Sequence, residues 1–282
     1  MLRIVTDGAA DMPEGWLERY DIQILPLMIR FEEQTYLQGV NIDNHSFYRM
    51  VKEKHTIPKT SLPSPRQIMD FYRSIALLGD EILSIHIASK LSGTFATVQT
   101  AAQELADEYK IFPFDSGAGS AAMGFMCREA RILSQKGWTV QNILNRLTEV
   151  RQNLTIIFTL ENLEFARLNG RVNALQEAVV SMLQIKPIIY LRDGLLQMGE
   201  KVRTRHRSIE RVIHYVVDRV GNQPVQLAVV HAHDTEAANS IMERLRSLLN
   251  VKEMITTELS IPVAANLGPG TVGIVAIPLL DE

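Results

Sequence analysis

A short hydroxyl-rich turn at residues 89–94, with the sequence SKLSGT, holds the residue types and spacing best suited to chemistry. It precedes an amphipathic segment, and the first turn of a helix leaves backbone N–H groups unpaired and carries partial positive charge. Ser92 and Thr94 add hydroxyl donors, and Gly93 lets a ligand approach the backbone closely. This combination predicts a site for a carboxylate or a phosphate. The alternative is that Ser92 only caps the helix.

The segments on either side of the turn indicate a strand and then a helix. Residues 82–87 are apolar and rich in isoleucine, as expected of a buried strand. After the turn, Phe95, Val98, Ala102 and Leu105 recur at helical spacing with polar residues between them. The turn therefore joins a strand to the start of a helix.

Composition and charge restrict the classes of protein to which this sequence can belong. The 282 residues, 46% hydrophobic and 22% charged, are typical of a globular protein with one large domain or two modest ones. A net charge of −3 argues against a nucleic-acid partner. No apolar run approaches the roughly 20 residues that span a bilayer, and the acids Asp7 and Asp11 argue against a signal peptide. The single cysteine, Cys127, is expected to be a packed thiol. We therefore expect a soluble cytoplasmic protein without stable membrane insertion.

The first half of the chain alternates between strand and helix patterns, which favours a mostly parallel sheet with helices on both faces. Asn44 is the expected cap of the second helix, and the proline-containing segment 60–65 is expected to be a rigid loop. Strands are predicted at residues 2–6, 22–31, 82–87 and 111–114, and helices near residues 13–20, 45–54, 65–78, 95–105, 120–135 and 140–152.

The second half indicates a mixed sheet, because Asp193-Gly194 between two apolar segments is a strong hairpin signal. We therefore predict two α/β domains, residues 1–153 and 154–282. Strands are predicted at residues 154–160, 186–191, 195–198, 225–231, 255–259 and 273–277, and helices at residues 163–169, 174–184, 208–219 and 236–249.

Common signatures of nucleotide and hydrolase chemistry are missing from the sequence, which has neither a P-loop nor a G-x-S-x-G motif. Residues 117–122, GAGSAA, fit G-x-G-x-x-A, but no acidic residue follows about 20 positions later, as a dinucleotide site requires. His231 and His233 would share one face of a strand, yet further ligands are lacking, so a surface pair is favoured over a metal site. We expect no metal and no cofactor.

Five motifs occur in order and together resemble the DegV family of fatty-acid-binding proteins. They are residues 60–64 (TSLPS), the turn at 89–94, Asp115-Ser116, Asn169-Gly170-Arg171 and Gly268-Pro269-Gly270. The resemblance covers essentially the whole chain. It implies two α/β domains with an acyl chain in or beside the cleft between them. It also implies a protein that does no bond chemistry but presents a fatty acid to a partner kinase, which phosphorylates the carboxylate for phospholipid synthesis.

The resemblance also implies roles for residues of the N-terminal half. Thr60 and Ser92 match the hydroxyls that such proteins direct at the carboxylate, and Ser61 lies beside Thr60 in the same motif. Gly93 and Thr94 match the turn around the head group. A carboxylate half removed from water needs several such donors to offset its lost hydration.

The resemblance points to two further positions at the head group, and for each of them an alternative or a departure from the family has to be stated. Arg171 matches a basic family position near the domain junction, where it could steer an anion; the alternative is a surface arginine after a helix cap. The family usually has histidine two residues before Gly-Pro-Gly, and this chain has Asn266 there. Asparagine can donate an amide N–H but carries no positive charge. Carboxylate binding is therefore retained as an expectation, while kinase-dependent phosphorylation is left open.

Residues 201–207 form a basic segment in a mildly acidic chain. Lys201, Arg203, Arg205, His206 and Arg207 are predicted to be a docking surface for the kinase, and the alternative is a solvated helix start. Two other functions stay open, an enzyme acting on a small anionic substrate in the same cleft and a regulator that binds no lipid. The sequence shows no nucleophile–base pair and no clear set of metal ligands, which favours a binding protein.

Overall fold

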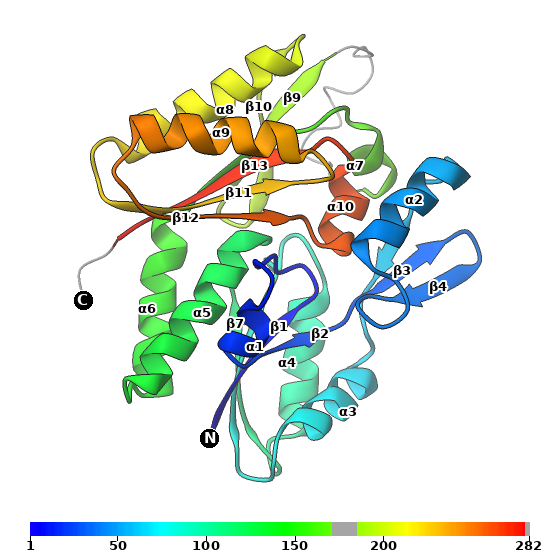
Figure 1. Cartoon of the computed structure of the whole chain (residues 1–282). Coiled ribbons are helices and arrows are strands. Elements are labelled where there is room, and N and C mark those ends of the chain that lie inside the picture. Colours follow the sequence, from blue (N-terminus) through cyan, green and yellow to red (C-terminus); the bar gives the residue numbers. More distant parts are fainter. Residues whose placement is uncertain (171–184, 280–282) are drawn as a thin grey trace.

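The computed structural model of the chain describes residues 1–170 and 185–279. A parallel sheet with its helices forms what we call the N-terminal unit, and a second, mixed sheet with its helices forms the C-terminal unit (Figure 1). Helices α5 (Ala121–Gln135) and α6 (Val140–Asn153) lie between the two sheets. The predicted boundary near residues 151–153 falls at the end of α6.

The N-terminal sheet has the strand order β2-β1-β6-β7, and all its pairs are parallel. Successive side chains of a strand point to opposite faces. In β1, Val5 therefore packs with α3 and α4, while Ile4 packs with α5 and α6. The elements are β1 (Leu2–Asp7), β2 (Ile22–Leu25), β6 (Glu81–His86), β7 (Lys110–Asp115), α1 (Trp16–Arg19), α3 (Pro65–Ile75) and α4 (Thr94–Glu104).

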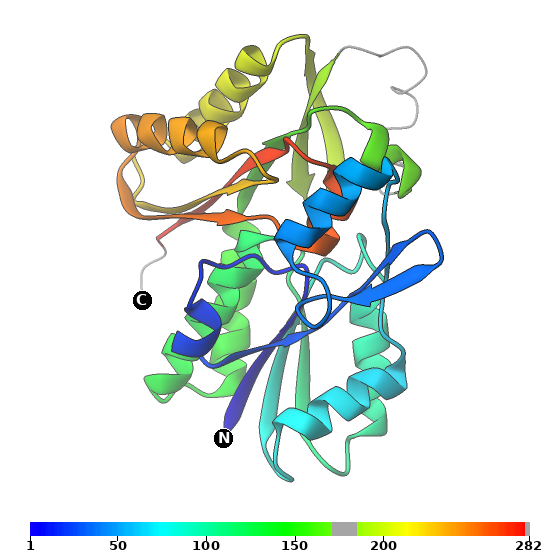
Figure 2. The same cartoon turned by 45° about the vertical axis from the view of Figure 1, so that its right-hand side comes forward.

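A small antiparallel sheet, of order β4-β3-β5, projects beside this unit (Figure 2). It is formed by β3 (Met28–Phe31), β4 (Gln34–Leu37) and β5 (Lys59–Ser61). The single strand predicted over residues 22–31 is divided at Pro26, which has no N–H to continue a ladder. The loop predicted at residues 60–65 begins inside β5, where Thr60 pairs with Ile29.

Helix α2 (Asn44–Lys54) connects the small sheet to the C-terminal unit. Its cap is Asp43, whose carboxylate accepts the Ser46 N–H at 2.7 Å, so the prediction that Asn44 caps this helix is wrong. Asn44 instead donates to Glu258 at 3.0 Å and to the Leu259 carbonyl at 3.4 Å. These bonds hold α2 beside α10 (Figures 1 and 2).

The C-terminal sheet has the strand order β10-β9-β8-β13-β11-β12. Only β11 and β12 pair in parallel, so the predicted mixed sheet is confirmed. Ile274 of β13 packs beneath α8 and α9, while its neighbour Val275 belongs to the core shared with the N-terminal unit. The elements are β8 (Thr155–Thr159), β9 (Lys186–Arg192), β10 (Leu195–Val202), β11 (Val225–His231), β12 (Val251–Glu258), β13 (Val272–Pro278), α7 (Glu164–Leu168), α8 (Arg205–Val220), α9 (Thr235–Leu248) and α10 (Ile261–Leu267).

Further differences from the predicted elements concern the helices. Helix α10 was not predicted, and the helix expected over residues 13–20 is only the single turn of α1. The helix expected over residues 174–184 lies outside the described residues. In the described part of the chain, no helix is long and apolar enough to cross a membrane.

Candidate functional site

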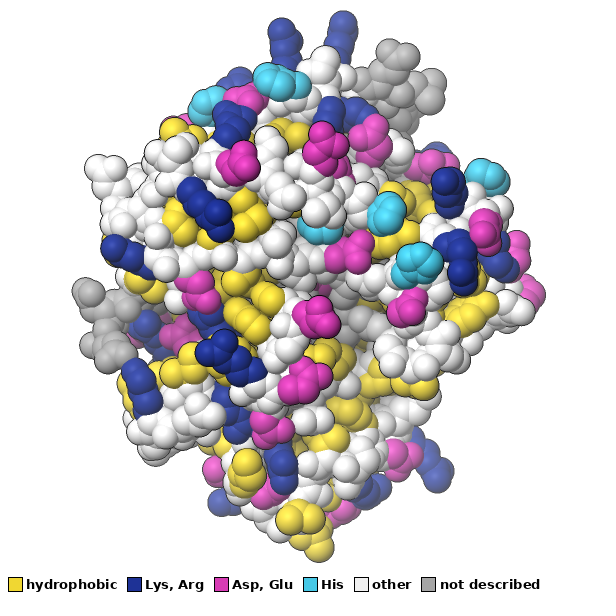
Figure 3. Space-filling view, in the orientation of Figure 1, with side chains coloured by type: hydrophobic (Ala, Val, Ile, Leu, Met, Phe, Trp, Pro, Cys, Tyr) yellow, Lys and Arg dark blue, Asp and Glu magenta, His cyan; other side chains and the backbone are white. Residues whose placement is uncertain are grey.

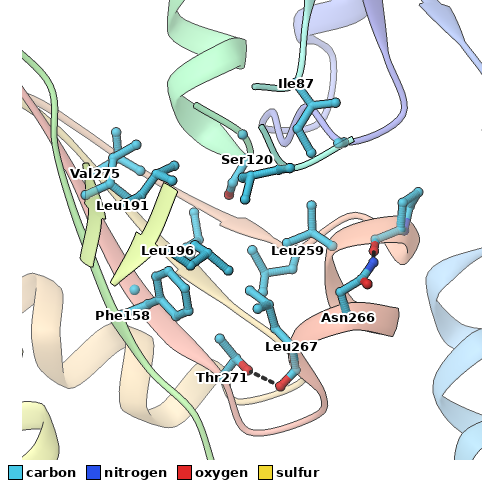
Figure 4. A pocket seen from close by; sticks show the side chains of 18 of the residues that line it. Ile87, Ser120, Phe158, Leu191, Leu196, Leu259, Asn266, Leu267, Thr271 and Val275 are labelled. Atoms are coloured by element: carbon cyan, nitrogen blue, oxygen red, sulfur yellow. Dashed lines mark hydrogen bonds between the residues drawn. The ribbon is translucent and has the colours of Figure 1, made fainter. Parts of the chain in front are cut away.

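An apolar cavity of about 130 Å³ lies between the two units (Figure 4). Ile87 and Ser120 approach it from the N-terminal unit, and Phe158, Leu196 and Leu259 face them from the C-terminal unit. Further apolar walls come from β8, β9, β13 and α10, including Ile156, Leu191, Val275 and Leu267. The cavity therefore depends on both units for its shape.

A few uncharged polar groups interrupt this apolar wall. They are the side chains of Thr60, Ser92, Ser120, Asn266 and Thr271. Among the described residues that line the cavity there is no lysine, arginine, histidine, aspartate or glutamate. Such a lining suits a ligand that is mostly hydrocarbon and carries one small polar group.

Three residues predicted from the sequence, Thr60, Ser92 and Asn266, line this same cavity. Their elements are adjacent, because α10 packs against β5 and Leu62, in the loop after β5, lies against Gly93 in the turn before α4. A Cβ atom built on Gly93 would lie only 3.2 Å from Leu62 Cδ2. The space that glycine leaves open at residue 93 is thus filled by this leucine side chain.

The other predicted residues of the two loops do not line the cavity. Ser61 is exposed, and Thr94 is fully buried. The Thr94 hydroxyl lies 2.9 Å from Ser92 Oγ. Thr94 therefore supports the serine, and Arg171 lies outside the described residues.

Ser92 lies one residue before the N-cap position of α4 and still bonds to the start of that helix. Gly93 is the residue at the N-cap position and Thr94 begins the helix, so Ser92 is not the N-cap. Its Oγ nevertheless accepts the Thr94 N–H at 3.3 Å. The hydroxyl thus combines a local structural bond with a position on the cavity wall.

Asn266 is held by its own helix. Its Nδ2 donates to the Pro262 carbonyl at 2.7 Å, while its Oδ1 is buried without a hydrogen-bond partner (Figure 4). One of the two N–H groups of the amide expected to bind a ligand is therefore already engaged. A half-turn of the amide would exchange the two groups and direct the N–H₂ the other way.

Asp11 is a buried carboxylate at the junction of the units, and sequence reasoning gave it no role in the site. It accepts the Ser120 hydroxyl from the start of α5 and the Ser260 N–H, at 2.7 Å, from the start of α10. Burial raises the pKa of Asp11 to about 6, although these hydrogen bonds oppose the rise. Spacing in the sequence gave no sign of this junction, because its members are more than 100 residues apart.

A Ser–His–Asp series is buried below the cavity. His86 Nδ1 lies 3.0 Å from Asp7 Oδ2, and His86 Nε2 lies 2.7 Å from Ser84 Oγ. All three side chains are fully buried, so no substrate reaches the serine. Asp7 also accepts the N–H groups of Ala9 and Ile87, at 2.9 and 3.0 Å, and both of these residues line the cavity. The series therefore holds the cavity wall in place.

Most of the basic side chains in residues 201–207 are exposed, and one is held in an ion pair. Lys201, Arg203 and Arg207 are exposed, and His206 is 84% exposed. Arg205 instead pairs with Asp234 at 2.6 Å and is partly buried. Positive and negative side chains are interspersed over the face shown in Figure 3, so that face carries no broad basic surface.

His231 and His233 do not form the predicted surface pair. His231 is buried at the end of β11, whereas His233 is exposed and stacks on Tyr48 with ring centroids 5.0 Å apart. Within the described residues, no group of three or more potential ligands could hold a metal ion. Cys127 is fully buried, as expected of a packed thiol.

Fold and cavity together define an α/β protein with an apolar pocket between two sheets. A family model described as "Uncharacterised protein, DegV family" matches residues 1–279. The chain therefore belongs to the DegV family, and both the resemblance and the predicted fold class are confirmed.

Individual relatives match over nearly the full length. Protein DegV of Bacillus subtilis is 30% identical over 275 residues, which are 97% of this chain and 98% of that protein. A fatty-acid-binding DegV family protein from Thermus thermophilus matches with a TM-score of 0.89 and 27% identity, over 99% of each chain. A stearic-acid-binding protein from Eubacterium ventriosum matches with a TM-score of 0.88 and 25% identity, over 99% of this chain and 98% of that one.

Proposed function

We propose that this protein binds a long-chain fatty acid in the cavity between its units. The observation that carries the proposal is the cavity itself, whose described walls are apolar apart from hydroxyl groups and one amide. The relatives described as binding fatty acids support it. In this proposal the carboxylate lies at Thr60 and Ser92, and the tail lies against Phe158, Leu196 and Leu267.

The energetics favour a long tail. Each buried CH₂ group contributes about 0.8 kcal/mol, whereas a carboxylate removed from water must recover its hydration through hydrogen bonds. The hydroxyls of Thr60 and Ser92 can donate such bonds. Rotation of the Asn266 amide would direct its N–H₂ at the carboxylate in exchange for its bond to the Pro262 carbonyl. From the resemblance, we propose that Gly93 and Thr94 shape this head-group turn, that Ser61 flanks it, and that Arg171 supplies positive charge.

The walls must move when the ligand enters. A cavity of about 150 Å³ holds a molecule the size of benzene, so about 130 Å³ is too small for a chain of 16 or 18 carbons. The cavity lies between two units that share walls from both. We infer that the fatty acid separates these walls as it binds.

We also propose that the protein presents the bound carboxylate to a kinase and does no bond chemistry itself. Arg207 supports a docking role for residues 201–207, because it lies in the first turn of α8, where the helix dipole disfavours positive charge. Lys201, Arg203, His206 and Arg207 make up the proposed surface, and Arg205 is removed from it because of its pairing with Asp234.

Charge reversal tests the docking surface. The Arg203→Glu, Arg207→Glu variant should slow turnover in a reconstituted assay with a fatty acid kinase and leave fatty acid affinity unchanged. Arg66→Glu with Arg246→Glu is the matched control, since both arginines are exposed on other helices. Equal turnover in wild type and the docking variant would remove residues 201–207 from the proposal.

A titration series tests fatty acid binding. Affinity should rise as saturated acids lengthen from 8 to 16 carbons, by roughly 0.5–0.8 kcal/mol per CH₂ in calorimetry. The alcohol of the same chain length should bind more weakly, because it lacks the carboxylate that several donors satisfy. If affinity does not depend on chain length, the tail does not occupy this cavity.

A further inference from the structure

A second cavity, of about 590 Å³, lies on the other side of the turn at residues 89–94. It shares Ile156 and Leu191 with the apolar cavity, but the rest of its lining is largely polar. Four short segments converge on it. They are the turn at Ser89 and Lys90, the start of the 117–122 motif, the end of α6 and the β9–β10 turn, which faces α8.

Four cations line this cavity, namely Lys90, Arg151, Arg192 and Arg219. Among the described residues, none of the four has a carboxylate within 4 Å. Their hydrogen bonds go to neutral groups. Lys90 donates to the Asp193 carbonyl at 2.8 Å, Arg151 to the Asp115 carbonyl at 2.8 Å and Arg192 to the Tyr215 hydroxyl at 2.6 Å.

The carboxylates of the lining, Asp115 and Asp193, offset only part of this charge: neither forms an ion pair with the four cations, although Asp193 interacts electrostatically with Arg192. Asp115 Oδ1 instead accepts the N–H groups of Ser89 and Gly117, at 3.2 and 2.9 Å, and so fixes two turns of the wall. Asp193 occupies the β9–β10 turn with a positive φ of 50°. The cavity thus holds an excess of positive charge in a chain whose net charge is −3.

Two of the arginines are held by aromatic rings. Arg151 lies 5.2 Å from the centroid of the Phe114 ring, and Arg192 lies 5.0 Å from that of Tyr190 and 5.8 Å from that of Tyr215. A guanidinium over a ring directs the N–H groups of its edge away from the ring. One nitrogen of each arginine already donates to a neutral group, and the N–H groups that remain can donate to a phosphate group. These side chains are therefore ordered before any anion arrives.

We propose that this second cavity binds a phosphorylated small molecule. Its volume lies within the 300–1,000 Å³ of typical ligand pockets, so it has room for more than a lone inorganic ion. The phosphate groups pair with Arg151, Arg192, Arg219 and Lys90, and the remainder of the molecule lies along Tyr215. Gly117 of the G-x-G-x-x-A segment forms part of the wall.

Calorimetric titration with pyrophosphate and, separately, with ADP tests the proposal. At low ionic strength, at least one probe should bind the wild-type protein with one site per chain, and affinity should fall as salt is added. The Arg151→Gln, Arg219→Gln variant should bind that probe about 10- to 100-fold more weakly. Arg219→Gln alone should also weaken binding. Arg219 makes no hydrogen bond or ion pair within the described residues, so its loss leaves the packing intact.

The matched control carries the same change of charge elsewhere. Arg66→Gln with Arg246→Gln, both exposed and outside this lining, should bind the probe as wild type does. The proposal fails if neither probe binds the wild-type protein. It also fails if the control loses as much affinity as the cavity variant. Neither measurement depends on fatty acid binding, so a failure of this proposal can be distinguished from a failure of the proposed function.

Discussion

At the scale of single residues, the hydroxyl of Ser92 has two roles at once. It accepts the Thr94 N–H at the start of α4 and also lines the apolar cavity. Asn266 is the contrasting case, because its donor is bound to Pro262 and its buried oxygen has no partner. An unsatisfied buried acceptor is costly. A ligand group that donates a hydrogen bond to this oxygen would recover part of that cost.

Replacement of Ser92 separates its two roles. Ser92→Ala should weaken fatty acid binding by about 1–3 kcal/mol, because one donor to a buried carboxylate is lost. Thr100→Ala is the control, since that exposed hydroxyl lies on the same helix and bonds the Ala96 carbonyl. The measurements are calorimetric affinity and thermal stability. A variant with unchanged affinity but a less stable fold would show that Ser92 only supports the helix.

At the scale of elements, Asp11 joins the starts of two helices from different units. Its bonds reach Ser120 before α5 and Ser260 before α10. Both helices contribute to the apolar cavity or adjoin residues that do. The protonation state of this one carboxyl therefore bears on how the units are held together.

Asp11 should make stability depend on pH. Its pKa of about 6 exceeds the usual value near 4, so the folded protein holds this proton more tightly than the unfolded chain. Its contribution to the free energy of unfolding is therefore greatest below pH 4 and is lost as pH rises through 6. Relative to Asp11→Asn, wild type should lose on the order of 2–3 kcal/mol between pH 4 and pH 7.

Urea unfolding of both proteins at several pH values measures this difference. Asparagine keeps the shape and does not titrate in this range. Its oxygen can accept the Ser260 N–H, and its N–H₂ can donate to Ser120 Oγ, which reverses the direction of that bond. Asp70→Asn, at an exposed position on α3, is the control and should track wild type. A constant difference between wild type and Asp11→Asn across the range would mean that the folded pKa of Asp11 is not raised.

Strongly patterned elements were predictable from the sequence. The β-branched segment of β11 occupies residues 225–231, as predicted, and Asp193-Gly194 makes the predicted hairpin turn. Helix α10 was missed because it has only seven residues and begins with Ile261-Pro262, too short for a periodic pattern. Ser120 and Asp11 were missed as members of the site because their contacts arise only from tertiary packing.

At the scale of the whole molecule, the apolar cavity exists only where the two units meet. One core extends from Ile4 of the N-terminal sheet to Val275 of the C-terminal sheet. Polar contacts such as those of Asn44 and Asp11 cross the same junction. Tail binding, wall movement and head-group presentation would thus all act on one interface, with the charged second cavity beside it.

Native mass spectrometry of the purified protein, followed by organic extraction, tests the central claim most directly. The expected result is one long-chain fatty acid per protein chain, released on denaturation and identified by its mass in the extract. A protein that is empty, or that carries only a nucleotide or a sugar, would contradict the proposed function.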